Sequence, residues 1–259
     1  MKSFYFLSFL SMLTIASVAK PIDTIQIKPG DLNMKALQTG SYSYIIYTKQ
    51  TKDSPAQRLT LVKINVEPKQ YHNKPAFIIT QEWDRDTIYH TAYSVFDAKD
   101  FSTIVHNSWW KPLGYSMKFD FETKTVDFTR NGVKGEISDS IKLKATNDFN
   151  QSFENYNLNW HADLIIYQLL PYKDSRTFVI NYYDPGFGKP EKVMYSVTES
   201  DVLIDGSGNK VDCWILSHSD NNGTERFWIA KKTKEVLKEE DSSTRGFRYK
   251  IKFGISGDR

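Results

Sequence analysis

The heptapeptide YSMKFDF, residues 115–121, shows the pattern that decides the fold of this chain. Aromatic or apolar residues occupy every second position, and the residues between them are polar or charged. Alternate side chains of a strand point to opposite faces, so the heptapeptide predicts a strand with one buried and one solvated face. A shift of one residue in the pairing would expose the whole apolar row, and the register is therefore well defined.

Similar runs occur along most of the chain, with turn sequences such as KDSP, RNG and DGSGN between them. Short strands at this spacing indicate antiparallel sheets built from hairpins and meanders. The sequence therefore predicts a mainly β fold of curved, half-barrel-like antiparallel sheets. The predicted strands are 41–48, 58–67, 75–83, 87–97, 102–110, 115–121, 125–130, 176–184, 191–204, 210–218, 224–231, 234–240 and 246–253.

One segment, NLNWHADLIIYQLLPYKD at 157–174, interrupts the alternation. Its apolar residues cover nearly all sides of a helical wheel, Asn157 or Asn159 can cap the start, and Pro171 ends it. These features predict one buried helix near 160–170. His161 and Asp163 are two residues apart and point about 200° away from each other on a helix, so they form no dyad. A role for either with partners from elsewhere in the chain stays open.

The strand run GFRYKIKF at 246–253 alternates in the same way, which assigns its aromatic row to the core. Arg248, Lys250 and Lys252 then form a solvated face. The alternative for this basic face is a contact with anionic lipid or glycan.

The two alternating runs also suggest an organisation in halves. At an offset of 132 residues, the segments 98–121 and 230–253 share five identities in 24 positions. Shared strand patterning produces such similarity too, so a duplication is one of two explanations. We predict a lead-in segment at 20–40, an N-terminal β half at 41–146 and a C-terminal β half at 147–259.

The N-terminus indicates export. Residues 1–19 combine Lys2, an apolar run and small residues before Ala19, which is typical of a secretory signal peptide, with an uncleaved anchor as the alternative. We therefore predict a periplasmic or cell-envelope location.

The single cysteine, Cys213, excludes an internal disulfide and is predicted to be a small buried residue. A formal net charge of +3 gives no support for a nucleic-acid partner.

Motifs for chemistry are missing from the sequence. The histidines show no metal-ligand spacing, DGSGN lacks the context of a nucleophile elbow, and 186–189 lacks the spacing of a phosphate loop. We therefore predict no catalytic residue, no metal and no cofactor.

The tryptophans are the best candidates for ligand contacts. Several predicted strands are apolar on both faces, so each face needs a cover. The helix can supply one cover, and a second sheet or a bound apolar molecule the other. Packing within the core is the alternative explanation for these rings. The candidate ligand-binding residues are Trp109, Trp110, Trp160, His161, Trp214 and Trp228.

The runs WHADLIIYQLLPYKDSRTFVINYYDPGF, YSVTESDVL, CWIL and FWIAKKTKEVLKEE give the second half a family resemblance. Over roughly 170–255, with weaker support over 40–130, the chain resembles exported bacterial proteins that carry the domain of unknown function numbered 3108. The resemblance implies an envelope location and a curved antiparallel sheet, similar to the half-barrels of periplasmic lipoprotein carriers, which hold acyl chains on a concave apolar face. It implies no catalytic residues.

Three functions follow from these observations. The first is non-catalytic binding of a lipid or other apolar ligand in a concave sheet. The second is a structural or interaction role with another envelope protein as partner. The third is hydrolysis of a glycan or lipid, which would need a nucleophile–base pair or convergent carboxylates in a cleft.

Overall fold

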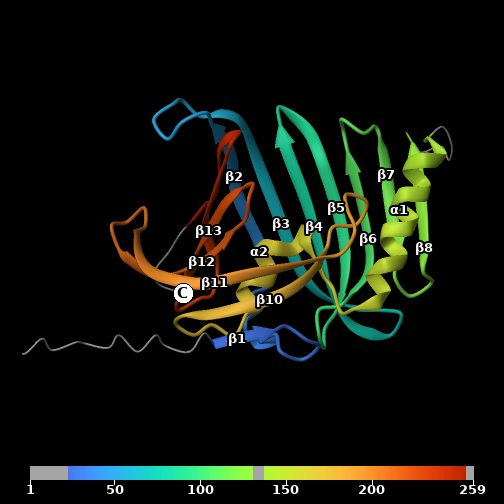
Figure 1. Ribbon diagram of the computed structural model, residues 1–259, viewed down its shortest axis with the longest axis horizontal. Coiled ribbons are helices and arrows are strands. Elements are labelled where there is room, and N and C mark those ends of the chain that lie inside the picture. Colours follow the sequence, from blue (N-terminus) through green and yellow to red (C-terminus); the bar gives the residue numbers. More distant parts are fainter. Residues whose placement is uncertain (1–22, 131–136, 255–259) are drawn as a thin grey trace, which may run out of the picture.

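Hydrogen bonds join the strands of the computed structural model into one curved sheet (Figure 1). The structure describes residues 23–130 and 137–254, so the predicted signal peptide lies outside the described residues. The strands are β1 (Asp23–Gln26), β2 (Gly40–Lys49), β3 (Gln57–Tyr71), β4 (Lys74–Arg85), β5 (Thr87–Asp97), β6 (Thr103–Trp110), β7 (Tyr115–Asp120), β8 (Thr125–Arg130), β9 (Leu158–Asn159), β10 (Arg176–Tyr183), β11 (Glu191–Ile204), β12 (Lys210–Ser219), β13 (Gly223–Ala230), β14 (Val236–Ser243) and β15 (Gly246–Lys252).

Two antiparallel meanders make up the sheet. The first runs from β2 to β8 and the second from β10 to β15, and β15 pairs with β2 to join them. Among the described strands, β1 and β9 add parallel pairs to β10. The two meanders curve toward each other and leave a concave space between them (Figure 1). The predicted mainly β fold of curved antiparallel sheets is confirmed.

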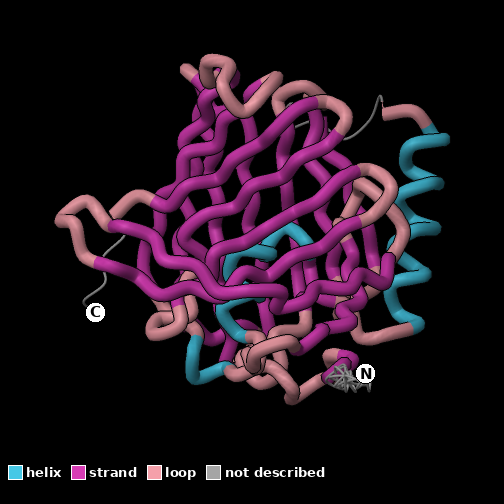
Figure 2. Tube along the Cα trace, turned by 60° about the vertical axis from the view of Figure 1, so that its left-hand side comes forward, coloured by secondary structure: helices cyan, strands magenta, loops and turns pink. Residues whose placement is uncertain are grey.

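The predicted helix near 160–170 is present in this space, as a series of three short helical pieces. They are the 3-10 helices η3 (Trp160–Ala162) and η4 (Tyr167–Leu169), with α2 (Asp163–Ile166) between them. The side chain of Asn159 accepts a hydrogen bond from the backbone N–H of His161 at 3.0 Å, as expected of a cap. Strands surround these turns in Figure 2. We call residues 158–170 the plug segment.

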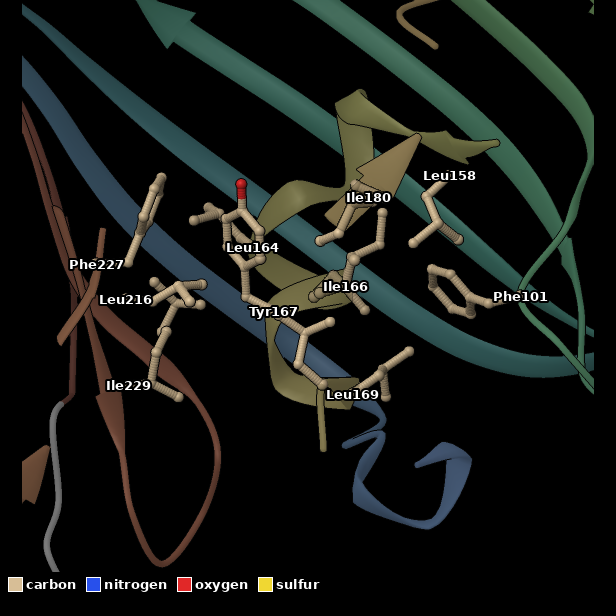
Figure 3. Close-up of a cluster of buried hydrophobic side chains, with 14 of the residues drawn as sticks. Phe101, Leu158, Leu164, Ile166, Tyr167, Leu169, Ile180, Leu216, Phe227 and Ile229 are labelled. Atoms are coloured by element: carbon tan, nitrogen blue, oxygen red, sulfur yellow. The ribbon is translucent and has the colours of Figure 1, made fainter. Parts of the chain in front are cut away.

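Side chains of the plug segment form the centre of the main core (Figure 3). Tyr167 points toward Leu216 and Phe227 of the second meander, whereas Leu158 lies beside Phe101 of the first. Each large apolar side chain buried in this way contributes roughly 1.5–3 kcal/mol to stability. The concave face is therefore largely filled by the protein's own residues.

A second helix, α1 (Asp139–Gln151), was not predicted. It lies beside β7 and β8 (Figure 1), where Ala145 and Phe149 pack against Met117 and Phe119. Its apolar residues are few, and Leu143 is exposed to solvent. The hydrophobic period that reveals a helix in a sequence is consequently weak here. The predicted boundary between the halves, 146/147, falls inside this helix.

Candidate ligand-binding site

A cavity of about 300 Å³ remains between the plug segment and the concave face of the sheet. One part of its lining is apolar and comes from β2, β3 and the plug segment, with three tryptophans beside it. The other part is polar and includes five acidic or basic residues, which come from the plug segment, β13, β15 and the position that follows β10. The lining consists of Tyr44, Ile46, Val62, Ile64, Gln81, Trp83, Trp110, Trp160, His161, Asp163, Leu164, Asp184, Glu225, Arg248 and Lys250.

The tryptophans of the cavity are held by other rings. Trp110 stacks on His90 with ring centroids 3.7 Å apart, and Trp83 meets Trp110 edge-on at 5.6 Å. Trp160 stacks on Tyr182 at 5.1 Å. Contacts of this kind fix the orientation of aromatic side chains, so the tryptophans form a preformed wall.

Strand β15 supplies the charged wall. The Lys250 ammonium lies 2.6 Å from Glu239 Oε2 and 3.1 Å from Asp163 Oδ2, and its side chain is 8% exposed. Burial alone would lower the pKa of Lys250, but the charges of Asp163 and Glu239 raise it above its ordinary value. The Arg248 guanidinium lies 2.9 Å from the other oxygen of Glu239. Charges buried at this depth require such partners.

The predicted solvated face of β15 is therefore wrong: Lys250 and Lys252 point inward, and Lys252 pairs with Glu235. The aromatic row of the strand lies on the other face, where Tyr249 stacks on Tyr47 at 5.0 Å. Carboxylates on the plug segment and on β14 stabilise the inward cations. Alternation alone cannot distinguish a buried charged row from a solvated one.

Glu225, on β13, completes the charged wall. It lies 3.8 Å from Arg248 and accepts a hydrogen bond from the Tyr195 hydroxyl at 3.1 Å. Burial, and next the charge of Glu239, raise the pKa of Glu225. Its carboxylate is thus the member of this wall that is least compensated by cations.

His161 lies at the edge of the cavity between two partners. His90 Nδ1 donates to the Trp109 carbonyl at 2.7 Å, so in the neutral His90 ring Nε2 is the acceptor. His161 Nε2 then donates to His90 Nε2 at 2.8 Å. His161 Nδ1 lies 3.4 Å from Asp184 Oδ1. Nε2 of His161 is therefore engaged by His90, and its Nδ1 lies against the Asp184 carboxylate, to which it donates only when the ring is protonated on both nitrogens.

A third histidine, His106, lies behind this pair. Its Nδ1 accepts from Ser94 Oγ at 2.8 Å and from the Asn159 side chain at 3.2 Å, whereas its Nε2 has no hydrogen-bond partner among the described residues. Burial lowers the pKa of His106 well below its ordinary value. Ser94 and His106 resemble a nucleophile–base pair, but both are buried and neither lines the cavity.

The structure brings together three of the six candidate ligand-binding residues. Trp110, Trp160 and His161 line the cavity. Trp109 precedes Trp110 in β6, and successive side chains of a strand point to opposite faces. The two remaining tryptophans, Trp214 and Trp228, do not line the cavity.

Trp214 and Trp228 contact other parts of the molecule. Trp214 stacks on Tyr172 at 5.0 Å. Trp228 belongs to a separate apolar cluster that includes Cys213, and its indole N–H donates to Asp201 at 2.8 Å. Cys213 is buried as predicted, and burial raises the pKa of its thiol to about 11.

Sequence reasoning missed Glu225 and Glu239, and it treated Arg248 and Lys250 as a solvated face, with a contact to anionic lipid or glycan as the alternative. In sequence these residues occupy the polar positions of alternating strands, which usually face solvent. His90 was also missed, since it lies 71 positions from His161. No local signal reports a contact between residues so far apart.

Among residues 23–130 and 137–254, no group of three or more histidine, cysteine, aspartate or glutamate residues is arranged to hold a metal ion. None of the helices described in the structure is both long and apolar enough to cross a membrane.

The fold and the cavity define a protein built on one open, curved β-sheet that encloses a segment of its own chain. Residues 45–251 match the model of the family described as "Protein of unknown function (DUF3108)", and the chain belongs to this family. The resemblance is thereby confirmed over the second half, and the match also covers the range 40–130 from residue 45 onward, where the support from the sequence was weaker.

No curated protein matches this chain. Among solved structures, it is similar to a β-barrel-like protein of the domain of unknown function DUF1849 from Brucella abortus, with 8% identity, a TM-score of 0.36, and coverage of 83% of this chain and 97% of that chain. It is also similar to a putative exported protein with a YmcC-like fold from Bacteroides fragilis, with 8% identity, a TM-score of 0.30, and coverage of 83% and 94%.

Proposed function

We propose that this protein is an exported envelope protein that binds a small amphiphilic molecule in the cavity, without catalysing a reaction. The observation that supports this most is the division of the lining. Ile46, Val62 and Ile64 form an apolar wall, and Glu225 and Lys250 lie on a charged one. Mainly apolar cavities with a few placed polar groups are the usual form of small-molecule sites.

The size of the cavity limits the kinds of ligand that it can hold. Small-molecule sites range over about 300–1,000 Å³, and a cavity of about 300 Å³ lies at the lower end. The plug segment occupies the rest of the concave face. A single alkyl chain or ring system fits this space better than a lipid with several acyl chains.

The arrangement of the histidines favours binding over hydrolysis. A general base needs a ring nitrogen within hydrogen-bond reach of the substrate, whereas Nε2 of His161 is engaged by His90 and its Nδ1 lies 3.4 Å from the Asp184 carboxylate. The Ser94–His106 pair lies outside the cavity lining. Export, in turn, is supported by the signal-peptide pattern of residues 1–19.

Two measurements test the binding role. The first is mass spectrometry of an organic extract of the purified protein, in which we expect a copurified amphiphile. The second is titration with N-phenyl-1-naphthylamine, a neutral apolar fluorophore. The substitution Val62→Phe fills the cavity and is expected to weaken binding of the fluorophore at least tenfold.

The matched control is Leu59→Phe, on the same strand but 54% exposed to solvent, which should leave binding unchanged. Equal binding by the wild type and Val62→Phe would contradict the proposal. An empty extract together with a copurifying protein would favour the interaction role instead.

A further inference from the structure

We infer that the ligand of this cavity carries a positively charged ammonium group, an inference that rests on the proposed binding function. Three features of the site lead to it: the balance of charges in the wall, the tryptophans that line the same cavity, and the position of Glu225 between two cavities.

The charged wall contains more carboxylates than cations. Lys250 contacts Glu239 and Asp163, and Arg248 contacts Glu239, with Asp241 at 3.3 Å and Glu225 at 3.8 Å. Among the ion pairs of the described residues, these two cations thus serve four carboxylates: Asp163, Glu225, Glu239 and Asp241. The wall lacks positive charge, and a cationic ligand would supply it.

An anionic ligand fits this wall poorly. Both cations are already engaged by carboxylates, so a ligand carboxylate or phosphate would have to compete with Glu239 for Lys250 and Arg248. It would also approach Asp163 and Glu225, which repel it. Like charges brought together in a partly buried site are strongly unfavourable.

The tryptophans offer the second feature. Trp83, Trp110 and Trp160 line the same cavity as the carboxylates. Tryptophan faces attract cations more strongly than other aromatic faces do, and combined aromatic rings are the usual binding site for quaternary ammonium groups. An ammonium group in this cavity would be stabilised by the rings as well as by the carboxylates.

Glu225 marks where this group would lie. A neighbouring cavity of about 200 Å³ shares Glu225 and Trp160 with the main one, and Asp220, Asp241 and Arg245 also line it. Glu225 therefore lies where the two spaces meet, with its side chain 23% exposed. We place the ammonium group beside Glu225 and Trp160, with the apolar part of the ligand directed toward Val62 and Ile64.

Calorimetric titration of the mature chain with four probes tests the inference. Octyltrimethylammonium, octanoate and octan-1-ol share an eight-carbon chain and differ in charge, and choline has the head group without the chain. We expect octyltrimethylammonium to bind at least tenfold more tightly than the other two octyl probes. Octanoate or octan-1-ol binding as tightly as the cation would overturn the inference while leaving the proposed function intact. Binding of none of the probes would overturn both.

The choline titration separates two sources of the ammonium group. Weak choline binding beside tight octyltrimethylammonium binding supports a cationic amphiphile such as a lipid with one chain. Choline binding as tightly as octyltrimethylammonium supports the ammonium site but identifies the ligand as a small free solute.

The substitution Glu225→Gln tests the placement. We expect it to weaken octyltrimethylammonium binding about tenfold and to leave octan-1-ol binding unchanged, whereas Glu225→Asp should retain the preference for the cation. The matched control is Glu199→Gln, since Glu199 pairs with Arg226 and does not line the cavity. Unchanged affinity for the cation in Glu225→Gln would overturn the placement. The comparison of probes on the unmodified chain does not depend on how this variant folds.

Discussion

At the scale of single residues, the histidines between the plug segment and the first meander are the groups most sensitive to pH. His90 is fully buried and bonds to His161 from the plug segment. Burial, and then the neighbouring His161, lower the pKa of His90 to about 3. His90 therefore stays neutral in the folded chain at pH values where an unfolded histidine is protonated.

This difference predicts acid sensitivity. Between about pH 6.5 and about pH 3 the unfolded chain binds a proton at His90 that the folded chain does not, so stability falls as the pH falls through this window. His90 alone accounts for up to about 1.4 kcal/mol for each pH unit. Urea unfolding at several pH values should show that His90→Gln is less stable than the wild type at neutral pH but loses less stability on acidification.

His72→Gln is the control for this series. His72 is an exposed residue that contacts Glu122 at the surface, and its removal should leave the pH profile unchanged. A His90→Gln profile parallel to that of the wild type would contradict the argument.

At the scale of elements, the strands were predicted well because their alternation is strict and one face is buried. The bounds predicted for β11 and β5 agree with the structure at both ends. The helical turns of the plug segment were predicted because its apolar residues do not alternate but cover nearly all sides of a helical wheel. Helix α1 was not predicted because it buries few of its side chains, Ala145 and Phe149. The orientation of β15 was predicted wrongly, because the carboxylates that face it come from distant segments.

The inward face of β15 leads to a prediction of its own. Lys250→Met leaves Glu239, which is fully buried, with one cation fewer, and loss of one partner from a buried pair costs about 3–5 kcal/mol. We expect a decrease of this size in the free energy of unfolding measured in urea. Lys63→Met removes the exposed Lys63–Glu82 pair and should change stability by less than about 1 kcal/mol. Similar effects of the two substitutions would show that the β15 charges are solvated.

At the scale of the whole molecule, the two meanders correspond strand by strand. The starts of β2 to β7 and of β10 to β15 lie 131 to 136 residues apart, close to the offset seen in the sequence. A duplication of one ancestral meander stays a prediction, and this regular spacing agrees with it. The cavity lies between the two meanders, so its residues could be recognised only after both had been placed.

The shared core predicts cooperative unfolding. The plug segment packs against residues of both meanders, and its core cluster contains Val62 and Ile79 as well as Phe227 and Ile229. Neither meander can keep this face buried alone, so we expect both to unfold in one transition. Hydrogen exchange in increasing urea should remove protection from β4 and from β13 at the same midpoint. Loss of protection in one of them at clearly lower urea would indicate independent halves.

The position of the plug segment also has a consequence for biogenesis. Residues 158–170 are translated after the first meander and before the second, so β2 to β8 leave the ribosome with their aromatic concave face still uncovered. Exposed apolar faces of nascent chains are prone to aggregate. Newly made chains should therefore depend on a holding chaperone until the last strand, β15, has paired with β2.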